Sequence, residues 1–423
     1  MNTTQTSLKK YYPWVVVGLL WVVALLNYMD RQMLSTMKPS MQVDIAELQS
    51  AANFGRLMAI FLWIYGFMSP VAGMIADKVN RKWLIVVSLF VWSGVTFAMG
   101  YAETFNQLYV LRAIMGVSEA LYIPAGLSLI ADFHSSKTRS LAIGIHMTGF
   151  YMGQALGGFG ATIADRFSWN TAFHSFGLVG IVYAVILVIF LREKKVEVSS
   201  LPGDGIRVKT KIPLFKGLGL LFTNISFWII LFYFAVPSLP GWGIKNWLPT
   251  LFAQKLDIEM SMAGPMSTIT IAASSFIGVI IGGILSDKWV QKNLRGRIYT
   301  SAIGLGLTIP ALLFLGFGDS LFSVISAAFC FGSGFGMFDA NNMPILCQFV
   351  SSKYRATAYG LMNMVGVFAG AFITDLLGKS TDAGNLGKSF AMLSVIVLVA
   401  LIIQISFLRP KANDFDELTN NHS

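Results

Sequence analysis

The sequence predicts an all-α integral membrane protein whose twelve transmembrane helices form two pseudo-symmetric six-helix bundles. Three observations lead to this prediction. Of the 423 residues, 55% are hydrophobic and only 12% are charged, about half the charged fraction of an ordinary soluble domain. The chain also contains twelve apolar runs of about the 20 residues that a membrane-spanning helix needs. Motifs of its first half return in its second half. A soluble enzyme, a disordered scaffold and a disulfide-stapled secreted domain all fit this composition poorly.

The predicted spans follow one another with short connections. They cover residues 12–34, 54–77, 83–101, 106–133, 139–163, 170–191, 222–251, 263–287, 298–317, 320–349, 355–377 and 388–408. The first run has no small-residue cleavage site and continues into the polar residues 27–31. We therefore interpret it as a retained helix and not as a signal peptide.

The basic residues predict the orientation of the chain. With both termini placed in the cytoplasm, 22 of the 31 lysines and arginines fall on the cytoplasmic side, seven fall on the opposite side, and Arg31 and Arg112 lie within the membrane. Lysine and arginine resist translocation, so this asymmetry supports both the twelve-helix count and the cytoplasmic termini. It also explains the net charge of +10 without a nucleic-acid partner.

The chain divides into two halves with an internal repeat. We predict an N-terminal bundle at 1–191, a cytoplasmic linker at 192–216, a C-terminal bundle at 217–411 and a cytoplasmic tail at 412–423. The linker is polar, carries seven basic residues and contains Pro202. Residues 133–139 align with 349–355 at an offset of 216. Duplicated bundles are typical of a carrier that rocks one half against the other.

One loop carries a family motif. Residues 73–82, G-M-I-A-D-K-V-N-R-K, resemble the signature loop G-x-x-x-D-(R/K)-x-G-R-(R/K) of the major facilitator superfamily, with Asn80 replacing a glycine. The resemblance implies the major facilitator fold and a transporter, not an enzyme, without catalytic residues or cofactor. No His and Cys pattern has metal-ligand spacing, so we predict no metal. Within the loop and its degenerate second copy, we expect Gly73 to allow close helix packing. We expect Asp77, Arg81 and Asp287 to act in conformational gating.

Three further motifs narrow the resemblance. They are N-Y-M-D-R at 27–31, R-x-x-x-G-x-x-E at 112–119 and N-W-L-P at 246–249, and together they look like the anion:cation symporter family. That family includes bacterial hexuronate and galactonate carriers and animal sialin. The resemblance implies proton-coupled import of an organic anion, such as a hexuronate, an aldonate or sialic acid, by a monomer in a bacterial inner membrane. Two alternatives stay open: a Spinster-like lipid carrier, and a membrane sensor that binds a ligand without transporting it.

Charged residues at membrane depth are the strongest candidates for function, because burying one costs at least about 2.5 to 3.5 kcal/mol. They are Asp30, Arg31, Arg112 and Glu119. Arg112 and Glu119 lie roughly 10 Å apart along one helix face, and we expect no basic residue at the depth of Glu119. Desolvation then favours its protonated form. We predict Glu119 and Asp30 as proton-coupling residues, with a fixed Asp30–Arg112 pair as the alternative.

Arg31 and Arg112 are predicted to bind the substrate carboxylate. Each arginine must first leave an acidic partner, and that acid is most easily freed when it is protonated. The proton and the anion therefore favour the same state of the carrier, and a carrier loaded with both is nearly neutral inside. Such a carrier can reorient, whereas a half-loaded one would carry an unpaired charge through an apolar barrier.

Several other residues complete the predicted site. We predict as substrate-binding residues Tyr28, Tyr151, Gln154, Asn341, Asn342 and Asn363, and as gating residues Pro240, Trp247 and Asp339. Helix packing is the alternative for Tyr28 and Gln154, and capping of a kink is the alternative for Asp339, which follows a glycine-rich stretch that predicts a bend. Helix 7 ends in residues 237–249 with three prolines, which we expect to hinge as an external gate. Lys245 in this segment either attracts incoming anions or is a solvated loop charge.

Overall fold

The computed structural model describes residues 3–76, 78–193, 221–223, 225–350 and 355–410. Asp77, most of the predicted linker at 192–216 and the predicted tail at 412–423 lie outside the described residues. The boundaries predicted for the linker and the tail therefore stay predictions.

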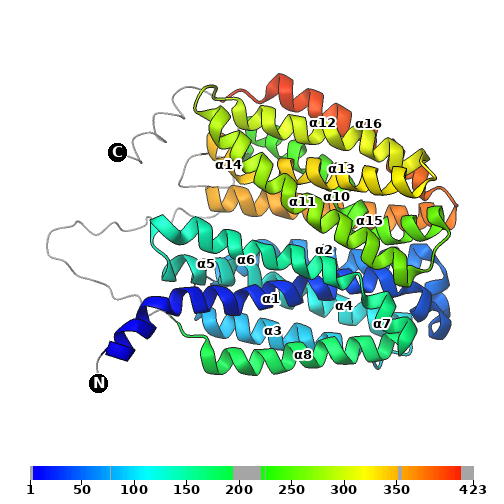
Figure 1. The fold of residues 1–423 in the computed structure, drawn as a ribbon, viewed down its shortest axis with the longest axis horizontal. Coiled ribbons are helices and arrows are strands. Elements are labelled where there is room, and N and C mark those ends of the chain that lie inside the picture. Colours follow the sequence, from blue (N-terminus) through cyan, green and yellow to red (C-terminus); the bar gives the residue numbers. More distant parts are fainter. Residues whose placement is uncertain (1–2, 77, 194–220, 224, 351–354, 411–423) are drawn as a thin grey trace.

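The described elements of the first half are all helical. They are α1 (Thr3–Asp44), the 3-10 helix η1 (Ala46–Gln49), α2 (Ala51–Ala76), α3 (Arg81–Met99), α4 (Phe105–Ala120), α5 (Tyr122–Phe133), α6 (Ser136–Gly157), α7 (Gly160–Arg166) and α8 (Trp169–Phe190). The second half contains α10 (Ile225–Leu256), α11 (Met260–Val290), α12 (Gly296–Phe317), α13 (Leu321–Asp339), α14 (Asn342–Phe349), α15 (Arg355–Asp382) and α16 (Leu386–Phe407). The two sets lie side by side, the first coloured blue to green and the second green to red (Figure 1).

The predicted all-α membrane fold is confirmed. Eleven helical spans in the described part of the chain are long and apolar enough to cross a bilayer, with α4 and α5 counted together, and likewise α13 and α14. The remaining predicted span, 139–163, corresponds to α6 and α7, and α6 packs between α1 and α11. It is less apolar than the others because it carries Arg139, His146 and Gln154.

The fourth helix of each half breaks at a matching place. Helix α4 gives way to α5 at Leu121, and α13 gives way to α14 at residues 340–341. Pro124 and Pro344 follow these breaks, and a proline cannot donate a backbone hydrogen bond to the carbonyl four residues before it. The bend expected in helix 10 is therefore present. As a result, Glu119 and Asp339 lie in the last turns of α4 and α13.

Helix α10 continues through the segment expected to hinge. Its three prolines lie inside one helix, Ile225–Leu256, and the hinge expected at 237–249 stays a prediction. A carbonyl freed by a proline in a transmembrane helix can be satisfied by a neighbouring helix. Pro249 leaves the carbonyl of Lys245 without its helical donor, and Gln32 Nε2 of α1 donates to that oxygen at 2.9 Å. A proline on one half thus creates an acceptor for the other half.

We use "linker end" for the end of the bundle at which α8 ends and α10 begins, and "opposite end" for the end that contains the α1–α2 connection. At the opposite end, hydrogen bonds join the halves. The Asp382 carboxylate of α15 accepts from the backbone N–H groups of Ala51 (2.6 Å) and Ala52 (2.9 Å) and from Ser50 Oγ (2.8 Å). These N–H groups lack partners within α2. One half therefore caps a helix of the other.

Close helix contacts depend on glycines other than the one predicted. A Cβ on Gly73 would meet nothing within 4 Å, so its expected role in close packing is wrong. A Cβ on Gly158 would lie 2.0 Å from Thr268 Oγ1 of α11, and one on Gly153 would lie 2.2 Å from the Leu25 carbonyl of α1. Gly158 therefore permits the approach of the halves near the opposite end, and Gly153 permits the tight α1–α6 contact.

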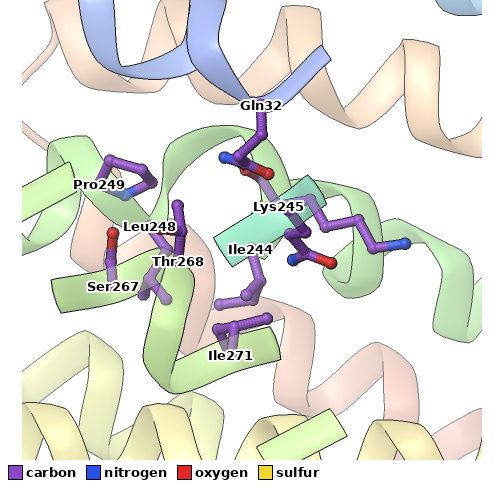
Figure 2. A pocket seen from close by; sticks show the side chains of 9 residues that line it. Gln32, Ile244, Lys245, Leu248, Pro249, Ser267, Thr268 and Ile271 are labelled. Atoms are coloured by element: carbon purple, nitrogen blue, oxygen red, sulfur yellow. Dashed lines mark hydrogen bonds between the residues drawn. The ribbon is translucent and has the colours of Figure 1, made fainter. Parts of the chain in front are cut away.

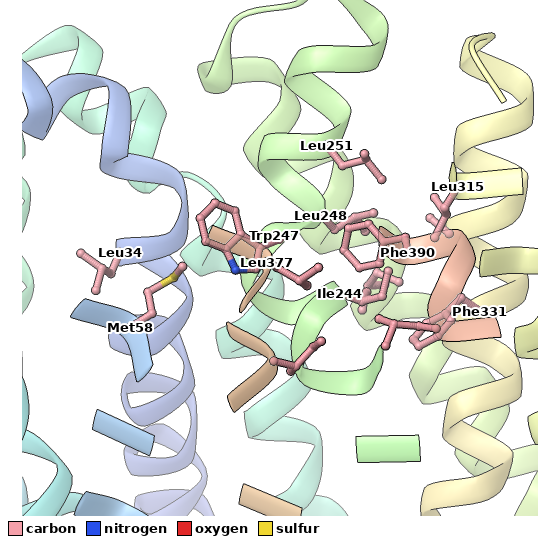
Figure 3. Packing of buried hydrophobic residues seen from close by; sticks show 14 of the residues in the cluster. Leu34, Met58, Ile244, Trp247, Leu248, Leu251, Leu315, Phe331, Leu377 and Phe390 are labelled. Atoms are coloured by element: carbon pink, nitrogen blue, oxygen red, sulfur yellow. The ribbon is translucent and has the colours of Figure 1, made fainter. Parts of the chain in front are cut away.

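Trp247 also joins the two halves near the opposite end. It is fully buried, its Nε1 donates to the Thr374 carbonyl at 3.0 Å, and its ring lies edge-on to Phe54 of α2. Figure 3 shows it next to Leu34 and Met58 of the N-terminal half. Pro240 is also buried within α10. Trp247 thus packs apolar surface of both halves together.

We expect Asp382→Ala to separate the halves at the opposite end, because it removes the carboxylate that accepts all three of the hydrogen bonds from residues 50–52. A helix-capping carboxylate contributes about 1 kcal/mol, which corresponds to roughly a fivefold larger open population. Spin labels at positions 47 and 383, in a variant lacking Cys330 and Cys347, would report this population by distance measurement.

The matched control for this experiment is Asp319→Ala. Asp319 lies at the same end but pairs with Lys255 (3.0 Å) within the C-terminal half. An Asp382→Ala distribution identical to that of the parent protein would show that the cap does not hold this end closed.

Candidate functional site

A cavity lies between the halves. The N-terminal half lines it with Tyr28, Met147, Phe150, Tyr151 and Gln154, and the C-terminal half with Lys245, Ser275, Phe335, Gly336 and Asp339. Its empty volume, including space open to solvent, is about 470 Å³. The wall combines aromatic rings with a few polar and charged groups, as such sites generally do.

A narrower pocket of about 160 Å³ shares Gln154 and Lys245 with the cavity. Its other lining residues are Gln32, Ile244, Leu248, Pro249, Ser267, Thr268 and Ile271 (Figure 2). The Gln32 bond to the Lys245 carbonyl crosses the halves here, as does the bond from Thr268 Oγ1 to the Ala155 carbonyl at 3.1 Å. The route from the cavity toward the opposite end is therefore narrow and bridged.

A buried ion pair lies in the N-terminal half. Arg31 Nε lies 2.6 Å from Glu119 Oε2, the same oxygen accepts from Asn27 Nδ2 at 2.8 Å, and the Glu119 side chain is 0% exposed. The expectation that no basic residue lies at the depth of Glu119 is therefore wrong. The Arg31 guanidinium also lies over the rings of Tyr28, Phe61 and Tyr65, so aromatic groups enclose the pair.

Arg112 and Asp30 are buried near this pair but do not bind each other. No ion pair within 4.0 Å joins them, so the fixed Asp30–Arg112 pair is not formed. The Arg112 guanidinium lies 4.6 Å from the centroid of Phe61, and Asp30 Oδ2 accepts from Thr96 Oγ1 at 3.4 Å. The two arginines and two acids balance in formal charge.

This cluster has unused hydrogen-bonding capacity. Buried atoms without a partner among the described residues include Asp30 Oδ1, Arg31 Nη2, Arg112 Nε and Glu119 Oε1. Buried polar groups are normally satisfied. The cluster is therefore chemically suited to take up a proton, a water molecule or an anion.

The C-terminal half contributes charges of its own. Asp339 Oδ1 accepts from Asn342 Nδ2 at 3.1 Å. Lys245 Nζ lies 5.0 Å from the ring of Trp242 and 5.8 Å from that of Tyr28. Lys245 thus lies in the central cavity and is not a solvated loop charge, while the alternative that it attracts incoming anions stays a prediction. Sequence reasoning missed both this position and Asn27, although Asn27 opens the N-Y-M-D-R motif.

The other predicted site residues are distributed as follows. Tyr28, Tyr151, Gln154 and Asp339 line the cavity, whereas Arg31 and Arg112 are not among its lining residues. Asn341 Nδ2 donates to the Met337 carbonyl at 2.8 Å, Asn342 Oδ1 accepts from Tyr233 at 3.2 Å, and Asn363 is half-buried on α15. Both Asn341 and Asn342 are therefore engaged in contacts within the C-terminal half.

The predicted gating charges form ion pairs within each half. Arg81 pairs with Asp132 of α5, and Asp287 pairs with Arg297 at 3.6 Å while remaining 75% exposed. Asn80, at the position where the superfamily motif has glycine, caps α3 by accepting from the backbone N–H of Trp83. The substitution therefore has a local structural role.

Comparison with known proteins identifies the family. The sequence profile described as Major Facilitator Superfamily matches residues 20–374. The chain belongs to the major facilitator superfamily. It is thus a transporter-family protein and not an enzyme.

Relatives of this superfamily member cover almost its whole length. The hexuronate transporter of Bacillus subtilis is 25% identical over 93% of this chain and 94% of its own. The D-galactonate transporter of Escherichia coli O6:H1 is 22% identical over 96% and 97%. A sphingosine-1-phosphate transporter of Xenopus tropicalis is 24% identical over 95% and 83%. The sequence identity of this chain to sugar-acid carriers is therefore about the same as its identity to the Spinster-type carrier.

A solved structure shares the fold. A bacterial homologue of the human lysosomal transporter Spinster, in an inward-facing and unoccupied conformation, superimposes with a TM-score of 0.80 at 20% identity over 95% of this chain and 98% of its own. This likeness supports the two-bundle architecture described above.

Proposed function

We propose that this transporter imports an organic anion, a sugar acid such as a hexuronate or an aldonate, together with protons by alternating access. The observation that carries the proposal is the buried Arg31–Glu119 pair beside the cavity, 2.6 Å apart, in which each side chain has an atom without a partner among the described residues. Similarity to hexuronate and galactonate transporters supports the substrate class.

The ion pair suggests how coupling works. A carboxylate that binds Arg31 must displace Glu119, and a displaced, buried carboxylate is stable only if it takes a proton. Conversely, a proton on Glu119 weakens its bond to Arg31 and leaves the guanidinium available for the anion. Each ligand therefore favours binding of the other, as linkage requires. Asp30, one of whose oxygens has no partner in the described part of the chain, is the second candidate proton site.

The closed opposite end bears on the side of the membrane to which the cavity can open. The distribution of basic residues supports a cytoplasmic position for the linker end and both termini, and we propose that the membrane is a bacterial inner membrane. On that assignment the structure is closed toward the outside, and we propose that the protein acts as a monomer that releases substrate toward the cytoplasm. Separation of Asp382 from α2, and of Trp247 from Phe54, would accompany reopening.

The proposal is tested by uptake into proteoliposomes under an imposed pH gradient. D-glucuronate, D-galactonate and sialic acid are the substrates, and protein-free vesicles are the control. Concentrative uptake of at least one acid that collapses with a protonophore supports the proposal. Absence of uptake of all three acids contradicts this substrate class, and binding without counterflow would fit a sensor instead.

A Spinster-like lipid carrier is the second candidate. Met147, Phe150 and Phe335 give the cavity an apolar side, and a sphingosine-1-phosphate transporter is among the relatives. Sphingosine-1-phosphate should therefore be included as a competitor. Strong competition by this lipid, combined with no uptake of the acids, would favour the second candidate over the first.

A further inference from the structure

The charge arrangement of the N-terminal half has a counterpart in the C-terminal half. In the first half, a cation on the first helix (Arg31 on α1) meets a carboxylate at the break of the fourth (Glu119 on α4). In the second half, the first and fourth helices are α10 and α13, and they carry Lys245 and Asp339. Both of these residues line the central cavity. The internal repeat thus supplies two cation and carboxylate sets.

The carboxylates of the two sets have similar neighbours. Asn27 Nδ2 donates to Glu119 at 2.8 Å, and Asn342 Nδ2 donates to Asp339 at 3.1 Å. An amide next to each carboxylate can hold it in place while its cation is engaged elsewhere. The similarity therefore extends beyond the charges themselves.

The two cations differ in availability. Arg31 forms an ion pair with Glu119 and is not one of the residues that line the cavity. Lys245 is half-buried in that wall, and in the described part of the chain no carboxylate oxygen lies within 4.0 Å of its Nζ and no acceptor is bonded to it. A partly buried ammonium without an acceptor attracts an anion more strongly than one in water. Lys245 is therefore the cation that an incoming anion can reach first.

One ring lies beside both cations. The centroid of Tyr28 is 5.2 Å from Arg31 Cζ and 5.8 Å from Lys245 Nζ. An acid bound beside Tyr28 is therefore close to a cation from each half. Such a ligand attracts both halves toward itself, which is what a substrate must do to stabilise a closed cavity.

We propose that Lys245 is the anion-binding residue of the C-terminal half, and that its ammonium binds the carboxylate of the organic acid while Asp339 is its counter-charge in the empty cavity. Lys245 and the released Arg31 then hold the acid from opposite halves. This inference rests on the proposed function and names the second cation of that site.

The test compares binding and uptake of D-glucuronate and D-galactonate by four variants. Lys245→Gln should raise the Kd and the KM at least about tenfold, because a charge-assisted bond is lost. Lys245→Arg keeps the charge and should stay within a few fold of the parent. Asp339→Asn removes the counter-charge and should lower the Kd. Lys388→Gln is the matched control, because Lys388 is an exposed lysine on α16.

The outcomes separate this inference from the proposed function. If the parent binds and transports an acid and Lys245→Gln leaves the Kd unchanged, the inference fails while the proposed function stands. If the parent binds neither acid, the proposed function fails and the inference with it. Should Lys245→Gln not be recovered as a folded protein, Asp339→Asn decides, since an unchanged or weaker affinity in that variant contradicts the role given to Lys245.

Discussion

Glu119→Gln is expected to abolish accumulation of the sugar acid driven by a pH gradient while sparing exchange of substrate across the membrane. Glutamine has nearly the shape of the protonated side chain and can still accept hydrogen bonds from Arg31 and Asn27, the two present partners of Glu119. It cannot lose a proton, so the step that couples the two ligands disappears. Two assays in the same proteoliposomes measure this: uptake under a pH gradient, and counterflow without one.

The control for this variant is Glu103→Gln, because Glu103 is exposed at the opposite end and should leave both assays unchanged. Equal loss of accumulation and exchange in Glu119→Gln would show that Glu119 is needed for binding or folding and does not couple protons. Retention of accumulation would place the proton site elsewhere, with Asp30 as the next residue to examine.

Arg31→Gln is expected to reduce binding of the acid and to destabilise the protein at the same time. Removing one partner of a buried ion pair leaves the other uncompensated, which typically costs about 3 to 5 kcal/mol. Here the stranded group would be the Glu119 carboxylate, whose side chain is 0% exposed. The loss of stability should be large at alkaline pH, because the buried Glu119 carboxyl must then either stay charged or bind a proton at a free-energy cost. The loss should be smaller at acidic pH, where the carboxyl is protonated readily.

Thermal unfolding of detergent-solubilised protein at two pH values measures this effect. The double variant Arg31→Gln/Glu119→Gln should recover most of the lost stability, because it removes both charges and leaves two amides that can bond to each other. Additive losses in the double variant would mean that the two side chains act independently, and a pH-independent loss would mean that Glu119 is not the group left stranded.

The sequence predicted the fold well because membrane insertion depends on features that a single chain displays. Apolar length gives the spans, and the described helices follow the predicted ranges closely, for instance α8 (Trp169–Phe190) against 170–191. The break near Asp339 was also predictable, because Pro344 and the preceding glycines mark it locally. These features require no knowledge of which helices touch.

The site was harder to predict because its geometry depends on which helices touch. The predicted first span ends near 34, whereas α1 continues to Asp44. Its Arg31 meets Glu119 of α4, although no basic residue was expected at the depth of Glu119. The prolines of helix 7 predicted a hinge, whereas α10 continues through them to Leu256 and holds Lys245 in the cavity wall.

The continuity of α10 has a physical cause. In water, a proline inside a helix usually kinks or ends it. Within a helical bundle in a membrane, an unbonded carbonyl is costly, so neighbouring helices supply the missing donor and the helix continues. Gln32 does this for the Lys245 carbonyl. The donor belongs to the other half of the chain, so no local pattern reveals it.

The central claim is that the acid and the proton cross the membrane together. Proteoliposomes loaded with a pH-sensitive dye, without an imposed gradient, test it directly when a transported sugar acid is added outside. We predict that the lumen acidifies as the acid enters, at a rate that follows substrate concentration and is lost in Glu119→Gln. Uptake of the acid with no change in lumenal pH would contradict the account.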